Sequence, residues 1–374
     1  MIYLDNAATG GEKPHNVLTA VNAALQLCAN PGRGAHRLSI SALANVQACR
    51  TLFAKHFGCP SPDRVIFTKN CTESLNLAIF GALQKGDHVV TTCLEHNSVL
   101  RPLFALQKQG IIEYDVCPLE NGSIHPKTIK HLLRPNTKAV VVTSASNVTG
   151  YSPNLSAIRE LLPQNVLFIV DGAQGGGHIP LKMTGAGIDA LCFAGHKGLL
   201  GIQGSGVLLL SQRLSPLPLL YGGTGSISYT QAMPDFLPDA LEAGTLNYPA
   251  IVSLFEGLNY LTAHQEEISE RLKHLTAALI RGLKSFHGVT VYSQANPCGI
   301  VAFEHNRHPS EFLSMLLSKK YDIATRGGLH CAPLAHQALK TDGDGLLRIS
   351  FGHQNTEKDV DSLLSALHAI FQDA

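Results

Sequence analysis

Residues 166–174 read Val-Leu-Phe-Ile-Val-Asp-Gly-Ala-Gln, and this stretch decides the fold. An unbroken apolar run of this length, closed by a glycine turn, is typical of a parallel strand that is buried on both faces. The strand ends by presenting the carboxylate of Asp171 and the amide of Gln174 at its carboxyl edge. Ligands of open α/β sheets bind at that edge. We therefore expect a ligand site beside Asp171.

A second apolar run, at 190–193, leads into Ala-Gly-His-Lys-Gly at 194–198. If both runs are strands of one sheet, Lys197 lies at the same edge as Asp171. Such a pair suits pyridoxal phosphate (PLP), whose aldehyde needs an amine and whose ring nitrogen needs an anionic partner. Taken singly, each residue also has an ordinary interpretation, Asp171 as a helix cap and Lys197 as a solvated loop residue.

Outward from these runs, short β-branched segments alternate with turns and with helical patterns between residues 64 and 210. Apolar residues recur at three- and four-residue intervals at 72–83 and 155–162, which predicts helices there. The alternation predicts an α/β domain with a mainly parallel sheet. The seven predicted strands are 64–67, 88–92, 111–116, 139–143, 166–170, 190–193 and 206–210.

The second half of the chain predicts a smaller α+β domain. A glycine- and serine-containing loop at 221–229 precedes a long helical stretch at 249–283, which links the two parts. The remaining elements are predicted as strands at 289–292, 299–303 and 346–350, helices at 310–319 and 356–371, and a turn-rich segment at 326–333. The expected large domain is 14–255, and the expected small domain combines 1–13 with 256–374.

The composition excludes several classes of partner. The 374 residues are 45% hydrophobic and 15% charged, and their formal net charge of +1 gives no strong field for nucleic acid or anionic lipid. A small-molecule substrate fits better. The nine cysteines include no C-x-x-C pair, so we expect neither a zinc site nor a disulfide framework, and a reducing cytoplasm. The amino terminus lacks a secretory pattern, and no apolar stretch is long enough to span a membrane.

Two other segments suit a phosphorylated aromatic ligand. Residues 70–74, Asn-Cys-Thr-Glu-Ser, lie where a predicted strand turns into a helix, and a helix start offers N–H groups to a phosphate. His96 follows the strand 88–92, where an imidazole can stack on a flat ring or move protons. Many helices begin this way without a ligand, and with 18 histidines in the chain a lone one is usually structural.

The order of the motifs resembles the class V aminotransferase-like enzymes, and within them the cysteine desulfurases. The resemblance spans nearly the whole chain, and several ordered motifs are more specific than any one of them. The motifs are Leu4-Asp-Asn-Ala-Ala-Thr9, Cys71-Thr72-Glu73, Glu95-His96, Asn147, Asp171-Gly-Ala-Gln174, Gly195-His196-Lys197, Glu242-Ala-Gly-Thr245, Arg326-Gly-Gly-Leu-His-Cys331-Ala and Arg348.

The resemblance implies a PLP-dependent transferase of fold type I. In that family pattern, Lys197 forms the Schiff base and moves the substrate's α-proton, Asp171 pairs with the pyridinium nitrogen, Gln174 contacts the phenolic oxygen and His96 stacks over the ring. The further cofactor contacts implied are Cys71, Thr72, Asn147 and His196, joined by Thr245 from a second subunit. A homodimer is therefore part of the expectation.

The resemblance also implies the sulfur chemistry. Asn147 and Arg348 are expected to hold the substrate carboxylate, the arginine through its bidentate fork. Cys331 is expected to attack the sulfur of L-cysteine, which leaves an enzyme persulfide and alanine. Arg326 and His330 are expected to contact the substrate region and to favour the thiolate electrostatically. The compact cysteine segment resembles the short-loop group, in which sulfur commonly passes to an acceptor protein.

Two departures from the family pattern bear on these expectations. Ala194 stands where relatives usually have a serine, so one phosphate contact is missing, and Ser74 or a water is a candidate substitute. Residues 198–203 depart from the usual aromatic and proline pattern, which leaves the substrate open. The glycines at 175–177 lack the spacing of a nucleotide loop and are assigned to a turn.

Two alternatives use the same fold. The first is a selenocysteine lyase or cysteine-conjugate lyase, which would use Cys331 little or not at all. The second is a non-catalytic PLP-binding or sulfur-carrier scaffold, against which the intact Lys197, Asp171 and Cys331 argue. The sequence does not rank cysteine against selenocysteine, and it does not name the acceptor or the pathway.

Overall fold

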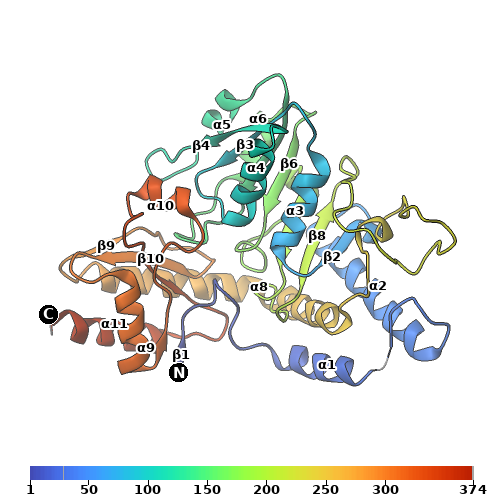
Figure 1. Ribbon diagram of the computed structural model, residues 1–374. Coiled ribbons are helices and arrows are strands. Elements are labelled where there is room, and N and C mark those ends of the chain that lie inside the picture. Colours follow the sequence, from blue (N-terminus) through green and yellow to red (C-terminus); the bar gives the residue numbers. More distant parts are fainter. Residues whose placement is uncertain (28, 373–374) are drawn as a thin grey trace.

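A seven-stranded sheet forms the centre of the protein (Figure 1). The computed structural model describes residues 1–27 and 29–372. The strands of this sheet are β2 (Val65–Thr68), β3 (Asp87–Thr92), β4 (Ile112–Cys117), β5 (Thr137–Thr143), β6 (Leu167–Asp171), β7 (Ala190–Ala194) and β8 (Gly206–Leu210). They lie in the order β2-β8-β7-β6-β5-β3-β4.

The sheet is mainly parallel, as predicted. Strand β8 runs antiparallel to both of its neighbours, β2 and β7, and all other neighbouring pairs are parallel. Every predicted strand overlaps an observed one, and the bounds differ by at most about two residues. Because β5, β6 and β7 are parallel neighbours, their carboxyl ends meet at one edge of the sheet.

Helices cover both faces of this sheet (Figure 1). Along β5, Val140 and Val142 belong to one apolar core, whereas Ala139 and Val141 belong to the other. The alternation follows from the two-residue period of a strand. The helices are α1 (His15–Gln26), α2 (Arg37–Phe57), α3 (Cys71–Ala82), α4 (Asn97–Lys108), α5 (Pro126–Leu132), α6 (Leu155–Leu161), α7 (Met183–Ala186), α8 (Tyr248–Leu283), α9 (Ser310–Tyr321), α10 (Pro333–Leu339) and α11 (Glu357–Gln372). Two 3₁₀ turns are η1 (Pro62–Arg64) and η2 (Asp239–Leu241).

The two ends of the chain meet in a second group of strands. Strands β9 (Val289–Val291), β10 (Ile300–His305) and β12 (Leu347–Ser350) form an antiparallel sheet in the order β12-β10-β9. Strand β1 (Ile2–Tyr3) pairs in parallel with β11 (Ile323–Ala324). The amino-terminal segment therefore packs with the carboxyl-terminal part of the chain.

Helix α8 connects the two groups of strands. It is 36 residues long, and the side chain of Asn247 caps its start by accepting from the N–H of Ala250. It contacts α1 and α2 as well as α11 and β10. The helix runs without a break across the predicted boundary between 255 and 256, and the division into 14–255 and 1–13 with 256–374 stays a prediction.

The segment 326–333 is turn-rich, as predicted, but Pro333 also begins α10, a helix that the sequence did not indicate. His330 and Cys331 have consecutive positive φ angles of 50° and 57°. Two non-glycine residues in this left-handed region are uncommon and form a tight bend. Among the described helices, none combines the length and the hydropathy needed to cross a bilayer.

Candidate active site

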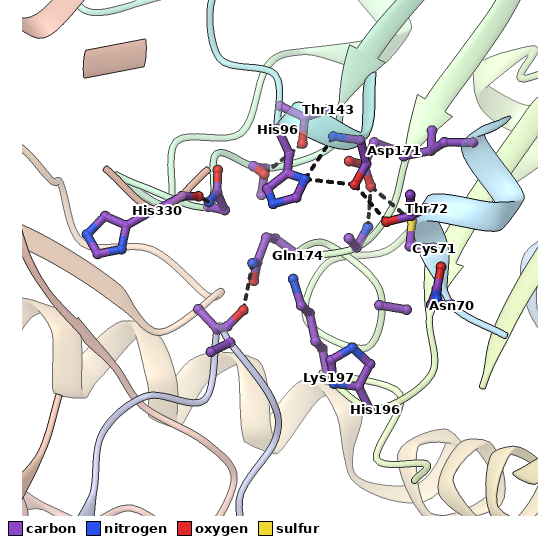
Figure 2. A pocket seen from close by; sticks show the side chains of 18 of the residues that line it. Asn70, Cys71, Thr72, His96, Thr143, Asp171, Gln174, His196, Lys197 and His330 are labelled. Carbon is purple, nitrogen blue, oxygen red and sulfur yellow. Dashed lines mark hydrogen bonds between the residues drawn. The ribbon is translucent and has the colours of Figure 1, made fainter. Parts of the chain in front are cut away.

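A cavity of about 210 Å³ opens at the carboxyl edge of the main sheet (Figure 2). Thr143 at the end of β5 and Asp171 at the end of β6 are register partners, and both line the cavity. Ala194 at the end of β7 lines it too, as does Lys197, three residues further on. The acid and the lysine therefore share one space, as the sequence predicted.

The carboxylate of Asp171 is held in place from two sides. Its Oδ1 accepts a hydrogen bond from the N–H of Ala173 at 2.8 Å and one from the Cys71 thiol at 3.4 Å. Burial lowers the pKa of the Lys197 ammonium, and the negative charge of Asp171 opposes that shift. A lowered pKa increases the fraction of neutral amine, which is the form that attacks a carbonyl.

Glycine turns set the position of Lys197. A side chain at Gly177 would meet the carbonyl oxygen of Gly198 at 2.2 Å, and one at Gly198 would meet the carbonyl oxygen of Gly176 at the same distance. Gly177 also has a positive φ of 84°. The residues 175–177 form a turn, as assigned from the sequence, and this turn packs directly against the backbone that carries the lysine.

The amino terminus of α3 forms another wall of the cavity. Asn70 caps the helix, its side chain accepting from the N–H of Glu73 at 2.9 Å. Cys71 and Thr72 occupy the first turn and line the cavity. Unpaired N–H groups and the positive end of the dipole make such a terminus a site for an anion. Burial and the charge of Asp171 hold the pKa of Cys71 well above its ordinary value, so this thiol stays protonated.

His96 caps α4 and lines the cavity. Its Nδ1 accepts from the N–H of Ser98 at 3.1 Å, which leaves the ring proton on Nε2. The hydroxyl of Ser98 lies 2.9 Å from the same Nδ1 and 2.8 Å from the hydroxyl of Thr72. Burial lowers the pKa of His96, with Asp171 in opposition, so the imidazole is neutral. Figure 2 shows the ring of His96 facing Lys197 across the cavity.

Gln174 joins the amino-terminal segment to the cavity. Its Nε2 donates to the carbonyl oxygen of Ala7 at 3.0 Å, and both residues line the space. His196 lines it as well, with its Nδ1 3.0 Å from the hydroxyl of Thr9. Burial, aided by the positive charges of Lys197 and Lys13, lowers the pKa of His196 to about 4.

The carboxyl-terminal part of the chain supplies two arginines, Arg348 in β12 and Arg326 outside the named strands. Arg348 is buried, donating from Nη1 to the carbonyl oxygen of Asn147 and from Nη2 to Asp5, both at 2.9 Å. Arg326 also lines the cavity, and its backbone pairs with that of Arg348. Burial lowers the pKa of Arg348, and the neighbouring charge of Arg326 acts in the same direction. Two guanidinium groups at one cavity favour an anionic ligand.

Three buried polar atoms in this wall have no partner among the described residues; one is Nδ1 of His330, and the other two belong to residues expected to bind the substrate. Those other two are Nε of Arg348 and Oδ1 of Asn147. The Nδ2 of Asn147 donates to the carbonyl oxygen of His330 at 2.7 Å, which fixes the orientation of the amide. Buried polar groups are nearly always satisfied, so these atoms indicate a ligand with both an acceptor and a donor.

His330 corrects one expectation. His330 is 4% exposed, and its Nε2 donates to the carbonyl oxygen of Leu346 at 3.0 Å. Burial, together with the positive charge of Arg348, lowers the pKa of His330 to about 2. The imidazole is therefore neutral, and it does not favour a thiolate as a cation would. Of the two residues expected to favour the thiolate electrostatically, only Arg326 carries a positive charge.

Cys331 lies beside the cavity. Its thiol is exposed and is not part of the lining, whereas the preceding His330 is. The carbonyl oxygen of Cys331 accepts from the N–H of Asn97 at 2.8 Å, directly after His96. The left-handed bend at His330 and Cys331 thus accompanies a change from a buried side chain to an exposed one.

Two other predicted residues lie elsewhere in the single chain. Thr245 lines a separate cavity of about 350 Å³ with Lys69 and Glu242, so its predicted contact requires a second copy. Ser74 does not replace the hydroxyl that Ala194 lacks. Its Oγ bonds the hydroxyl of Thr68 at 2.7 Å, because position 74 faces the sheet and not the cavity.

The sequence did not single out Ser98, which links Thr72 to His96. A serine two residues after a helix-capping histidine was the available signal, since such residues satisfy the first N–H groups of a helix. Thr143 was also missed, and its place at the end of a predicted strand opposite Asp171 was the only indication. Among the described residues, no cluster of side chains with metal-ligating geometry is present.

Comparison with known proteins identifies the family and the fold of this chain. The family model "Aminotransferase class-V" matches residues 2–363. The chain is 31% identical to a probable cysteine desulfurase of Methanothermobacter thermautotrophicus, covering 99% of this chain and 94% of that protein. It is 30% identical to a cysteine desulfurase of Pectobacterium atrosepticum, covering 99% and 93%.

Solved structures agree with the sequence relatives. The apo structure of the cysteine desulfurase from Thermococcus onnurineus NA1 superposes with a TM-score of 0.92 at 28% identity, covering 100% of this chain and 95% of that one. A cysteine desulfurase from Escherichia coli gives 0.89 at 28% identity, covering 99% and 94%. The fold class expected from the resemblance is confirmed. This chain therefore belongs to the aminotransferase class-V family, in which its sequence and fold are similar to those of the cysteine desulfurases.

Proposed function

We propose that the protein is a PLP-dependent cysteine desulfurase that converts L-cysteine to L-alanine and collects the sulfur on Cys331. One observation carries the proposal: Lys197 and Asp171 line the same cavity, and Cys331 directly follows a residue of its lining. The names of the relatives support the same activity.

The residues present fit PLP. The amine of Lys197 matches an aldehyde, and the carboxylate of Asp171 matches a ring nitrogen that carries a proton. The start of α3 with Thr72, together with His196, offers donors to a phosphate. His96 supplies a neutral flat ring for stacking, and Gln174 supplies an amide. When bound, PLP supplies the electron sink that stabilises negative charge at the substrate's α-carbon.

The substrate's carboxylate is assigned to the arginine wall. Nε of Arg348 is a buried donor without a partner, and Arg326 adds a second positive charge. Asn147 lines the same cavity, and its buried Oδ1 has no partner; this oxygen suits a donor, such as an amino or hydroxyl group, better than a carboxylate. Nζ of Lys197, as a neutral amine, would accept the substrate's α-proton.

The sulfur step belongs to Cys331. Its thiolate Sγ forms a bond to the substrate sulfur while the substrate's Cβ–S bond breaks, and the electron pair of that bond remains with the substrate carbon. Protonation of that carbon gives alanine, and the enzyme holds a persulfide. The bend at residues 330 and 331 must carry the thiol inward for this attack. Its exposed position suits the subsequent transfer of sulfur to an acceptor protein.

A homodimer completes the proposed site, because Thr245 of a second copy is needed at the phosphate. Large apolar side chains are exposed on the segment that leads to Glu242 and Thr245, which supports burial of this segment in the dimer. They are Leu217 at 71%, Leu220 at 50%, Tyr221 at 76% and Tyr229 at 93% exposure. Sedimentation of the purified protein tests the dimer.

A reducing cytoplasm fits the eight described cysteines, all of which are free.

Two measurements test the activity. Protein supplied with PLP should show an absorption band that Lys197→Ala abolishes and that borohydride fixes covalently in the wild type; colourless protein would overturn the cofactor assignment. Cys331→Ala should keep the band but lose alanine and sulfide production from L-cysteine. If that production survives unchanged, the persulfide route is wrong and a lyase that does not use Cys331 is the better assignment. Rates on cysteine and selenocysteine, measured side by side, then decide the preferred substrate.

A further inference from the structure

The amino-terminal segment holds His196 at three points. The N–H of Gly10 and the Nζ of Lys13 both donate to the carbonyl oxygen of His196, at 2.8 Å and 3.0 Å. The hydroxyl of Thr9 lies 3.0 Å from its Nδ1. The backbone of the histidine and one of its ring nitrogens are thus fixed by residues 9–13, and His196 lines the cavity.

Thr9 has a second partner on its other side. The Nε2 of Gln203 donates to the hydroxyl oxygen of Thr9 at 3.3 Å. An amide nitrogen can only donate, so it occupies a lone pair of the hydroxyl and leaves the hydroxyl hydrogen for another acceptor. Nδ1 of His196 is the neighbouring atom that can accept it. The chain of bonds then runs from Gln203 through Thr9 to His196.

This direction decides where the ring carries its hydrogen. The pKa of His196, lowered to about 4 by burial and by Lys197 and Lys13, makes the imidazole neutral at physiological pH, with a single N–H. If Nδ1 accepts from Thr9, the hydrogen resides on Nε2. A neutral Nε2–H can donate to an anion in the cavity, whereas the opposite tautomer would present a lone pair and repel it.

We propose that Gln203 and Thr9 are positioning residues that hold His196 in the Nε2–H tautomer, so that it donates a hydrogen bond to the cofactor's phosphate. The inference rests on the proposed PLP site. Ala194 offers no hydroxyl at this cavity, which makes the donor at His196 more important. Gln203 belongs to the segment 198–203, which departs from the usual family pattern, and this proposal gives that departure a role.

The tautomer can be read by NMR without turnover. Full-length protein with ¹⁵N-labelled histidine is recorded at neutral pH, with and without PLP, and the His196 signals are assigned by their loss in His196→Asn. The wild type should carry its hydrogen on Nε2. Thr9→Val should lose this preference and Thr9→Ser should restore it. A wild-type ring with hydrogen on Nδ1 would overturn the inference, whether or not PLP binds.

Gln203→Glu gives the sharpest test, because it should reverse the direction of the hydrogen bonds from residue 203 through Thr9 to His196. A carboxylate only accepts, so the hydroxyl of Thr9 turns toward residue 203 and must then accept from Nδ1–H. The variant should show hydrogen on Nδ1 and bind PLP about tenfold more weakly, as expected for loss of one hydrogen bond to a charged group. Residue 203 is exposed, so folding should be unaffected. Gln107→Glu, an exposed glutamine of α4, controls for the added charge and should change neither reading.

The outcomes separate the two proposals. If PLP does not bind the wild type, the cofactor assignment fails, while the tautomer measurement still tests the bond chain on its own. If the tautomer reverses in Gln203→Glu but PLP affinity stays within twofold of the control, the proposed donation to the phosphate is wrong. An unchanged tautomer in that variant refutes the role of Gln203.

Discussion

Replacing Glu242 by glutamine should destabilise the protein far more than the same change at an exposed ion pair. Glu242 is 5% exposed and Arg50 is 2% exposed. The carboxylate accepts from Nη1 and Nη2 of Arg50 at 2.9 Å and 2.5 Å and from the N–H of Phe67 at 2.6 Å. Breaking a buried pair by removing one charge costs about 3–5 kcal/mol, because the remaining charge stays buried.

We expect Glu242→Gln to lie near the lower end of that range, at about 3 kcal/mol. The amide oxygen can still accept one bond, and Arg50 retains its bond to the carbonyl oxygen of Val65 and its place over the ring of Phe67. Changing both partners together, Arg50→Met with Glu242→Leu, should cost much less than the single change, since no charge is then left unpaired.

Urea unfolding followed by far-ultraviolet circular dichroism measures the loss. The chain has no tryptophan, so fluorescence of its nine tyrosines serves as the second probe, and coincident transitions support a two-state treatment. Glu267→Gln is the matched control, because Glu267 pairs with Arg271 at the surface, where the two side chains are 64% and 39% exposed, and should cost below about 1 kcal/mol. If Glu242→Gln costs no more than this control, the reasoning from burial is refuted.

Three other changes have defined outcomes. Lys197→Ala should abolish both the PLP absorption band and alanine formation, as checked by spectroscopy and amino-acid analysis; a retained band would place the covalent link elsewhere. Cys331→Ala should leave PLP affinity within about twofold, since the thiol is outside the cavity lining, while sulfide release from L-cysteine under reducing conditions falls to background. Burial raises the pKa of Glu95 to about 8 from 4.5, so this carboxyl contributes stability at low pH that is lost as the pH rises through that interval. The free energy of unfolding should therefore fall less between pH 5 and pH 8 in Glu95→Gln than in the wild type, and equal slopes in urea titrations would contradict the assignment.

The main sheet could be predicted from the sequence because its strands are short apolar runs between turns. The run 166–170 lies fully in the core, and a strand buried on both faces shows as an unbroken apolar segment. Helix α10 was missed because Pro333 was interpreted as the end of a turn, although proline also favours the first position of a helix. The pairing of β1 with β11 could not be foreseen, since two-residue strands carry no periodic signal.

Many residues of the cavity could be named from the sequence, though not Ser98 or Thr143, and the environments of the named ones could not be predicted. His330 stands in a polar, glycine-rich segment, which favours an exposed and readily charged ring; the folded chain instead buries it beside Arg348. Ser74 is one helical turn from Asn70, and only the direction of α3 against the sheet shows that its hydroxyl turns away. Both differences depend on contacts between segments that are distant in the chain.

The length of α8 constrains how the enzyme can discriminate its substrates. At 36 residues it is a rod of about 54 Å, packed at one end against α1 and α2 and at the other against α11 and β10. Asp171 ends a strand of the main sheet, whereas Arg348 lies in the carboxyl-terminal sheet, and the unbroken α8 contacts elements of both parts of the chain. A large closing motion between the two parts of the chain would require α8 to bend. Discrimination between substrates should therefore rely on side-chain chemistry and on local movement of the bend that carries Cys331.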